Sequence, residues 1–511
     1  MEFNISQDLK KMTKLKDMNI LKENFSKTNF INSLLLPIFL VLLNFIVKGI
    51  YISNNSIAGD EPFSIYIAQL DIISIIEQLS TGNNPPLYEI LLHFWIKLFG
   101  ISEFSVRMPS LLFSCITLIF LFKIGISFFN KRIALYVSLI FIFSNYHIIF
   151  AHEARVYALM GMLSTISIFY YLKIITLNKS NKWHFYLLIL ANILLIYSHY
   201  FGVFVLLVIS IHFIMNKEMR NKYFKHFFLS IGILIFLYLP NVLVVFNRFI
   251  DSSVNGTWIQ PPSGFESIYN MLWSFSNAPV VTVSVVVVLL SALIKTLVKR
   301  KIVKSNIIAN KLIIIWFVFT FFFMFFISYW IPVFFDRYLM SVSISFCLLV
   351  AIASDYLIDK KYVKYIIPSL VCLMFIVTAK PNITNKRNVN ETIGKLKELN
   401  SEENVIVYFS PSWYDLNFIY YYDNDVFRNY NNKNLKSNIH KYFDENNIYP
   451  IDNVSQIEMN LLKDKDKIVY LDAGANFSFP NNNILNLLEN KLVLKNKYEY
   501  YEIFKIYEFR N

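Results

Sequence analysis

The most constraining feature of this 511-residue sequence is a series of apolar blocks with few charged side chains. The blocks are about 17 to 25 residues long, which is the length a helix needs to cross ~30 Å of hydrocarbon. Because lipid cannot hydrogen-bond the backbone, such blocks must be helical. A soluble protein would have to bury every block in its core, and about eleven blocks are too many for that. The sequence therefore predicts a polytopic α-helical membrane protein.

Charge composition and placement support this prediction. Charged residues make up 16% of the chain, whereas soluble domains contain about 25%. The net charge of +13 is explained by Lys and Arg in cytoplasmic loops, so nucleic acid is not an expected partner. Cys115, Cys347 and Cys372 lie inside apolar blocks and are spaced for neither a metal site nor disulfides.

Lys and Arg also predict the orientation of the chain. Residues 1–32 contain six lysines and are expected in the cytoplasm, whereas residues 53–86 lack Lys and Arg and are expected outside. Eleven crossings then place the N-terminus inside and the C-terminus outside. The predicted spans are 33–52, 106–128, 133–151, 155–176, 183–198, 201–216, 226–247, 279–297, 311–331, 338–357 and 362–379.

The short apolar segment 87–99 does not fit this alternation as a crossing. Glu89, His93 and Lys97 recur every four residues and give a helix one polar stripe. We therefore expect an interfacial or re-entrant helix within a first extracytoplasmic loop, residues 53–105.

Composition changes after Lys380 and predicts a small α/β domain over residues 385–511, outside the membrane. ENVIVYF (403–409) and KIVYLDA (467–473) are typical of buried strands, each preceded by a possible helix. The tail YEYYEIFKIYEF (498–509) alternates as one or two strands do. The sequence contains no glycine-rich phosphate loop here and leaves the role of this domain open.

Polar side chains gather at the predicted outer boundaries. Asp60-Glu61 can accept a proton from an attacking hydroxyl or bind a divalent cation, although a solvated loop explains the pair equally simply. The other groups are Asn84 and Tyr88 beside Pro85-Pro86; His152, Glu153, Arg155 and Tyr157; His199 and Tyr200; and Arg337 with Tyr338. Arginine at such a boundary can hold a phosphate or simply extend towards water. Together these residues suit a substrate with an anionic head and an apolar tail.

The motifs among these residues resemble a known family. The stretch from NNPPLYEILLHFW to LIFLFKIG (83–125), AGDEPFS, HEARVYAL and FFDRYL resemble the dolichyl-phosphate-mannose-protein mannosyltransferase-like family, glycosyltransferase family 39 and its bacterial relatives. The aminoarabinose lipid A transferase belongs to the same GT-C superfamily. The resemblance covers about residues 33–380 and implies a GT-C transmembrane catalytic domain there. Family members often carry His or Lys where this chain has Asn84, which cannot supply charge.

The resemblance implies inverting transfer of a sugar from a polyprenyl-phosphate donor to a lipid, glycan or protein acceptor, on the extracytoplasmic face of the cell (plasma or inner) membrane. By that likeness Asp60 is the catalytic carboxylate, Glu61 supports it, and Glu153, Arg155 and Tyr157 line the site. Arg155 or Arg337 lies near the donor phosphate. No cofactor is certain, and a divalent metal at Asp60 and Glu61 stays open. A flippase of lipid-linked sugars, or a polymerase or ligase of surface glycans, are the alternatives.

Overall fold

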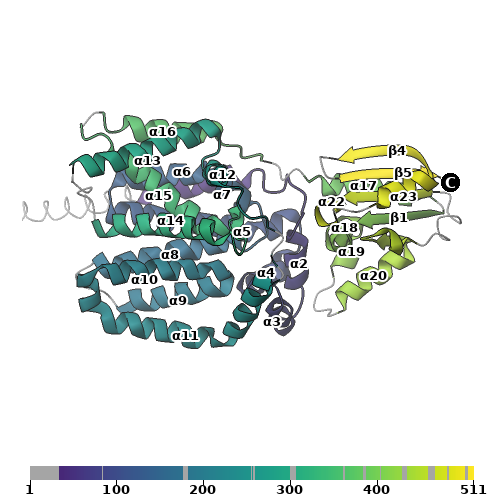
Figure 1. The fold of residues 1–511 in the computed structure, drawn as a ribbon, viewed down its shortest axis with the longest axis horizontal. Coiled ribbons are helices and arrows are strands. Elements are labelled where there is room, and N and C mark those ends of the chain that lie inside the picture. The colour runs from purple at the N-terminus through teal and green to yellow at the C-terminus, as the bar shows by residue number, and fades with distance from the viewer. Residues whose placement is uncertain are drawn as a thin grey trace, which may run out of the picture.

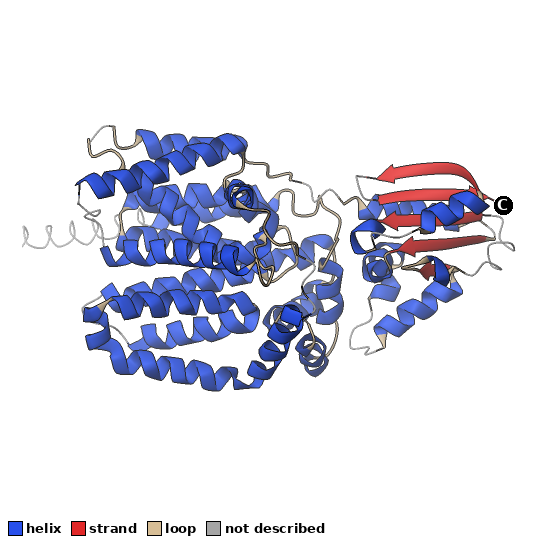
Figure 2. Cartoon of the chain, viewed as in Figure 1, coloured by secondary structure: helices blue, strands red, loops and turns tan. Residues whose placement is uncertain are grey.

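A computed structural model describes the chain in two parts, a helical bundle and a smaller sheet domain at one end of it (Figure 1). It describes residues 34–82, 84–176, 182–254, 256, 259–299, 307–360, 363–383, 387–402, 404–428, 434–457, 467–479, 483–500 and 504–510. The predicted cytoplasmic segment 1–32 and Asn83 lie outside the described residues. Helices make up the bundle, and all the described strands lie in the sheet domain (Figure 2).

The long bundle helices coincide with the apolar blocks of the sequence. They are Leu34–Gly49, α5 (Glu103–Phe128), α6 (Lys131–Ile142), α7 (Asn145–Ala151), α8 (Tyr157–Thr176), α9 (Lys182–Ser198), α10 (Val203–Met215), α11 (Lys217–Val254), α13 (Pro279–Lys299), α14 (Ile307–Ile327), α15 (Met340–Tyr356) and α16 (Ile366–Thr378). Side-chain caps fix some starts: Ser102 accepts from the Ser105 N–H before α5, and Asn130 from the Ile133 N–H before α6.

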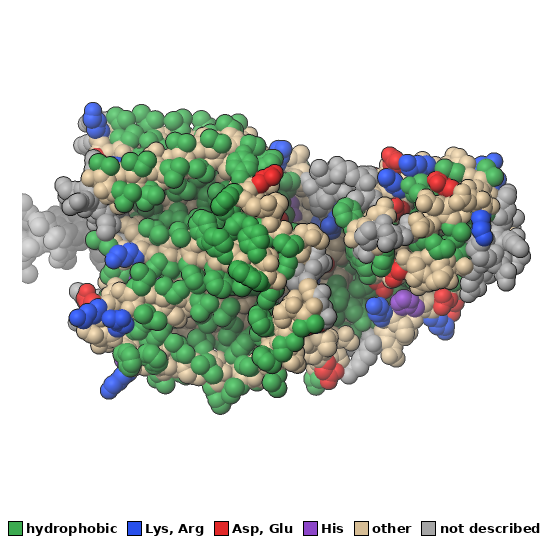
Figure 3. Space-filling model, viewed as in Figure 1, with side chains coloured by type: hydrophobic (Ala, Val, Ile, Leu, Met, Phe, Trp, Pro, Cys, Tyr) green, Lys and Arg blue, Asp and Glu red, His purple; other side chains and the backbone are tan. Residues whose placement is uncertain are grey.

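Six described helices are long and apolar enough to cross a membrane, and a seventh crossing results if α6 and α7, bent by 61°, form one span. The remaining predicted spans correspond to shorter apolar helices of 10–17 residues. Apolar side chains cover the outside of the bundle, whereas charged side chains gather on the sheet domain and at the opposite end of the bundle (Figure 3). The chain is thus an integral membrane protein. The count of eleven crossings stays a prediction.

Three helices of the first loop cover the bundle at the end that carries the sheet domain (Figure 1). They are α2 (Glu61–Ala68), α3 (Ile72–Ser80) and α4 (Leu87–Phe99). The expected helix 87–99 is therefore confirmed as a helix. Its polar stripe is divided, because Glu89 and His93 are buried whereas Lys97 is exposed. The His93 ring bonds the Ala68 carbonyl at 2.9 Å, so α4 supports the end of α2.

The sheet domain has five strands in the order β2-β1-β3-β5-β4. The strands β1 (Val405–Ser410), β2 (Ile448–Pro450) and β3 (Lys467–Ala473) are parallel, and β5 (Phe504–Arg510) pairs antiparallel with β3 and with β4 (Val493–Tyr500). The two predicted strands are thus confirmed, the tail forms two strands, and the short β2 was not predicted. Helices α17 (Val389–Asn400), α18 (Asp415–Tyr422), α19 (Asn424–Phe427), α20 (Leu435–Glu445), α22 (Ala475–Ser478) and α23 (Ile484–Lys491) complete the domain.

Alternating residues of the central strands pack to both faces of this sheet. Val405, Val407 and Phe409 join a core with α17, α18 and α20. Ile406 and Tyr408 belong to a second core on the other face with α23. Burial on both faces explains why β1 and β3 are continuous apolar runs instead of alternating ones.

Candidate active site

The first loop presents Asp60 at the start of α2. Gly59, just before it, has φ 62°, a left-handed conformation that glycine adopts without strain. A Cβ on Gly59 would also lie 2.2 Å from Nη1 of Arg387. The turn therefore requires glycine, and it places the guanidinium of Arg387 directly against the residue before Asp60.

Asp60 lies among guanidinium groups. Its Oδ2 is 2.8 Å from Nη1 of Arg337 and 3.9 Å from Nη2 of Arg155, and its side chain remains 55% exposed. Burial of the carboxyl opposes its ionisation, but Arg155 and Arg337, with Arg387 further away, outweigh burial and hold the pKa of Asp60 below its usual range. Asp60 is therefore an accessible carboxylate at neutral pH.

Glu61 points the other way and is buried. Its two oxygens accept from Nε and Nη2 of Arg107 at 2.8 and 2.7 Å, and from the backbone N–H groups of Ala154 and Ala58 at 2.8 and 3.2 Å. Arg107 is fully buried and also donates to carbonyls of residues 52, 55 and 56. The pair therefore fastens the first loop to α5 and to the turn before α8.

A polar cavity of about 420 Å³ opens beside Asp60, and we call it the site cavity. Six of the residues predicted as site residues line it, together with six that were not predicted. The former are Asp60, Asn84, Arg155, Tyr157, Arg337 and Tyr338, and the latter are Phe63, Leu79, Thr81, Gly82, Glu89 and Arg248. The guanidinium groups of three arginines thus face a single cavity with one ionised carboxylate at its edge.

A hydrogen-bonded chain orients Arg155 in this cavity. Its Nη1 donates to Oγ of Ser64 at 2.6 Å, and that hydroxyl donates to Oε1 of Glu89 at 3.0 Å. Glu89 is 2% exposed, and burial raises the pKa of its carboxyl. Its Oε2 has no hydrogen-bond partner among the described residues. Glu89 is therefore a buried carboxyl with a free oxygen in the wall of the site.

An apolar groove of about 360 Å³ runs along α8, α9, α10 and α11. Tyr200 lines it near the outer ends of these helices, and Val245 lines it on α11. Arg248, one helical turn further along α11, lines the site cavity, so one helix borders both spaces. An apolar groove on a helix that also borders clustered arginines suits a lipid chain with an anionic head.

The other predicted residues support the site without lining the site cavity. Tyr88 is buried. The ring of His152 bonds the Lys48 carbonyl at 2.6 Å, and burial lowers the pKa of His152 to about 4, so the ring is neutral. Burial raises the pKa of Glu153 to about 7. His199 packs its ring against Tyr157 and Tyr338, with centroids 5.9 and 5.6 Å apart, and so backs the cavity wall.

The sheet domain holds the loop that carries Asp60. The amide of Asn417 donates to the Gly59 carbonyl at 3.1 Å. The Ile57 N–H donates to the Tyr421 hydroxyl at 2.6 Å, and that hydroxyl donates to the carboxylate of Glu103. Tyr420 bonds the carbonyl of residue 101 at 2.6 Å. Helix α18 therefore contacts the chain on both sides of Asp60, a role that the sequence did not indicate.

The geometry does not make Asp60 and Glu61 a cation site. Both oxygens of Glu61 are occupied by N–H donors on the side of the loop away from Asp60, and Asp60 faces an arginine. Within the part of the chain that the structure describes, no group of three or more His, Cys, Asp or Glu residues is arranged to hold a metal ion.

Comparisons with known proteins bear on the family likeness and the fold of the chain. Residues 83–245 match the family model "dolichyl-phosphate-mannose-protein mannosyltransferase". No curated protein matches the chain in a sequence comparison.

Solved structures share the fold over most of the chain. ArnT from Cupriavidus metallidurans in the apo state is 10% identical with a TM-score of 0.57, covering 92% of this chain and 97% of that one. The same protein bound to undecaprenyl phosphate is 11% identical with the same TM-score and coverage. The archaeal oligosaccharyltransferase AglB from Archaeoglobus fulgidus, in complex with an inhibitory peptide and a dolichol-phosphate, is 11% identical with a TM-score of 0.50, covering 86% and 69%. The chain thus has the GT-C glycosyltransferase fold and, over residues 83–245, is similar to the dolichyl-phosphate-mannose-protein mannosyltransferase family.

Proposed function

We propose that this chain is a membrane glycosyltransferase that moves a sugar from a polyprenyl-phosphate donor to an acceptor hydroxyl on the outer side of the membrane. The observation that carries the proposal is the ionised Asp60 at the edge of a cavity lined by Arg155, Arg248 and Arg337, beside an apolar groove that α11 also borders. A lipid phosphate matches both spaces at once.

The arginines would bind the donor phosphate. Guanidinium groups form paired, charge-assisted hydrogen bonds with phosphate oxygens. Negative charge grows on the phosphate as the sugar leaves, so fixed donors stabilise the transition state more than the ground state. Arg155, held by Ser64 and Glu89, is positioned before the substrate arrives. The polyprenyl chain would lie in the apolar groove.

Asp60 would accept the proton of the acceptor hydroxyl. The hydroxyl oxygen forms a bond to the anomeric carbon, the bond from that carbon to the phosphate oxygen breaks, and its electron pair leaves with the phosphate. In the free protein the ion pair with Arg337, at 2.8 Å, makes Asp60 a weak base. A bound phosphate competes for Arg337, so donor binding would increase the basicity of Asp60. Attack from the face opposite the phosphate gives inversion.

Glu61 has a different role in this proposal. Its oxygens are saturated by Arg107 and by two backbone N–H groups, so we assign it to positioning Asp60 and not to the proton transfer. No step is assigned to a metal, because the Asp60–Glu61 pair does not converge on one point.

The comparisons support the donor class. The solved ArnT complex contains undecaprenyl phosphate, and the AglB complex contains a dolichol-phosphate. The sugar stays open, whether hexose or pentose, as does the acceptor, whether lipid, glycan or protein. Lys and Arg side chains gather at the end of the bundle opposite the sheet domain (Figure 3). This placement supports a cytoplasmic N-terminus and an extracytoplasmic site in the plasma or inner membrane.

A flippase is the alternative from another class, and a polymerase or ligase of surface glycans would share the donor. A flippase needs polar residues along a path across the bilayer. The polar groups described above cluster at one end of the bundle, which favours an enzyme.

The test of donor recognition is binding of undecaprenyl phosphate to purified protein in nanodiscs. We expect saturable binding that weakens at least tenfold in Arg337→Ala and is unchanged in Arg220→Ala, a matched arginine in the first turns of α11 that donates to the Ile214 carbonyl. Equal binding by Arg337→Ala and the wild-type protein would contradict the phosphate assignment.

A further inference from the structure

A second cavity lies at the same end of the bundle, and the proposed transfer does not use it. Its volume is about 310 Å³, and we call it the α12 cavity after helix α12 (Phe265–Phe275). Volumes of about 300–1,000 Å³ are usual for small-ligand sites. Its polar and aromatic lining comes from α7, α12, the turn at Asp336 and the chain after α16, and includes Tyr146, Asn270, Trp273, Asp336 and Lys380.

Part of the polar lining is structural. Asn277 donates to the carbonyls of Phe143 and Phe375 at 2.8 and 3.2 Å and accepts from the Asn145 N–H at 2.7 Å. Asn145 in turn accepts from the Lys380 N–H at 2.7 Å. These bonds join the start of α7, the turn before α13 and the end of α16, and so hold Asn145 and Asn277 of the lining in place.

The remaining groups present a pattern that suits a sugar ring. Trp273 is 42% exposed, and Asn270, one helical turn earlier in α12, is also exposed. One face of a pyranose ring carries C–H groups and packs on an aromatic surface, while its hydroxyls donate to carboxylates and both donate to and accept from amides. Trp273, Asn270 and Asp336 provide these partners in one cavity.

The charge of the α12 cavity differs from that of the site cavity. Asp336 and Lys380 contribute one carboxylate and one ammonium group, whereas the site cavity contains three guanidinium groups. A phosphorylated ligand would therefore favour the site cavity, and the α12 cavity suits an uncharged ligand.

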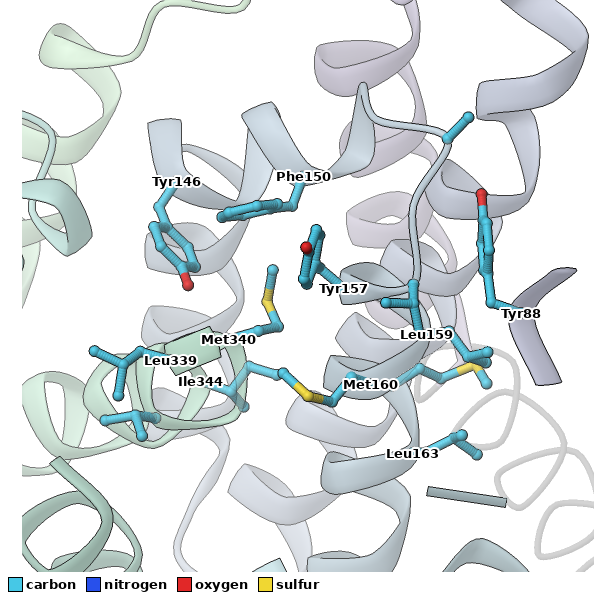
Figure 4. Packing of buried hydrophobic residues seen from close by; sticks show 14 of the residues in the cluster. Tyr88, Tyr146, Phe150, Tyr157, Leu159, Met160, Leu163, Leu339, Met340 and Ile344 are labelled. Carbon is cyan, nitrogen blue, oxygen red and sulfur yellow. The ribbon is translucent and has the colours of Figure 1, made fainter. Parts of the chain in front are cut away.

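Neighbouring residues line the two cavities. Asp336 lines the α12 cavity, and the next residue, Arg337, lines the site cavity and contacts Asp60. Phe150 of the α12 cavity packs on Tyr157 of the site cavity with ring centroids 5.3 Å apart. Figure 4 shows Tyr146, Phe150 and Tyr157 in a row; the first two line the α12 cavity and Tyr157 lines the site cavity. The Tyr146 hydroxyl donates to the Asp336 carbonyl at 2.5 Å.

We propose that the α12 cavity binds a neutral sugar ring of the acceptor, stacked on Trp273 and hydrogen-bonded by Asn270 and Asp336. The proposal rests on the proposed function, since it takes sugar transfer at Asp60 as given: Asp336 of the α12 cavity precedes Arg337, which contacts Asp60 at 2.8 Å. It narrows the acceptor class from lipid, glycan or protein to a molecule that ends in an uncharged glycan.

The test uses methyl α-glycosides of glucose, mannose and galactose as probes, with binding to the full chain in nanodiscs measured by saturation-transfer NMR. We expect saturable binding of at least one glycoside, weakened at least tenfold in Trp273→Ala and in Asp336→Asn but retained in Trp273→Phe. Trp330→Ala is the matched control, because Trp330 is 76% exposed and does not line the cavity.

Two outcomes would overturn the proposal: no saturable binding of any of the three glycosides, or equal binding by Trp273→Ala and the wild-type protein. Undecaprenyl phosphate binding in the same preparations separates this result from the proposed function. Trp273→Ala should retain lipid binding, whereas Arg337→Ala should lose it. Glycoside binding without lipid binding in the wild-type protein would refute the donor assignment but would still support a sugar site in the α12 cavity.

Discussion

Replacing Glu61 by Gln tests whether this residue positions the site or takes part in the chemistry. The substitution keeps the shape of the side chain but removes the charge opposite Arg107, whose guanidinium is fully buried. Breaking a buried ion pair by removing one partner costs about 3–5 kcal/mol, because the remaining charge is left uncompensated. Three backbone carbonyls also accept from Arg107, so we place Glu61→Gln near the lower limit, at about 3 kcal/mol.

The assay is reversible unfolding in mixed detergent micelles, combined with transfer activity. Asp355→Asn is the matched control, because Arg132 binds Asp355 through two bonds of 2.7 and 3.1 Å at a more exposed position. We expect that control to cost less stability and to leave transfer unchanged. A Glu61→Gln protein of wild-type stability with transfer reduced more than 100-fold would refute the positioning role.

Three further substitutions address the surroundings of Asp60. Gly59→Ala should impair transfer far more than Gly100→Ala. Both glycines have positive φ, but only Gly59 faces Arg387. Thermal unfolding and transfer activity are measured for both variants. Glu153→Gln should raise the melting temperature at pH 8.5 but not at pH 5. Burial raises the pKa of Glu153 to about 7, so the folded wild-type protein loses stability as pH rises through that value. Equal shifts of the melting temperature at both pH values would contradict this. Asn417→Ala should lower kcat about tenfold or less without changing the donor KM, because it removes one hydrogen bond to the Gly59 carbonyl. An unchanged kcat would refute the support role of the sheet domain.

Much of the fold follows from the sequence because lipid leaves few choices. An apolar block of sufficient length must be helical, and each predicted span coincides with one helix except 133–151, which comprises the bent pair α6 and α7. The buried strands β1 and β3 were recognisable for a related reason, since both faces of the sheet are covered. The short β2 was missed because three residues carry too little pattern.

The site was only partly predictable, because its residues meet through packing between distant helices. Asp60, Arg155 and Arg337 could be found as polar residues at outer boundaries. Glu89 was visible as part of a polar stripe, but a period of four does not reveal that Glu89 faces the site whereas Lys97 faces outward. Arg248, which also lines the site cavity, was not among the predicted site residues.

The pairing of Glu61 with Arg107 could not be predicted from the sequence either. Adjacent carboxylates in a sequence suggest a shared task, yet the first turn of α2 directs Asp60 into the site cavity and Glu61 into the core. Only the partner of each carboxylate, known from the fold, separates the two roles. The sheet domain was equally unreadable, since its contacts with the loop are made by single hydrogen bonds from α18.

The most direct test of the central claim is sugar transfer by Asp60→Asn protein in membranes, with lipid-linked sugar products and surface glycans identified by mass spectrometry. Asparagine keeps the size of the side chain but cannot accept the proton of the acceptor hydroxyl. We predict that transfer falls at least 1,000-fold, about 4 kcal/mol, while expression, membrane insertion and undecaprenyl phosphate binding are retained. Normal transfer by a well-inserted Asp60→Asn protein would contradict the account.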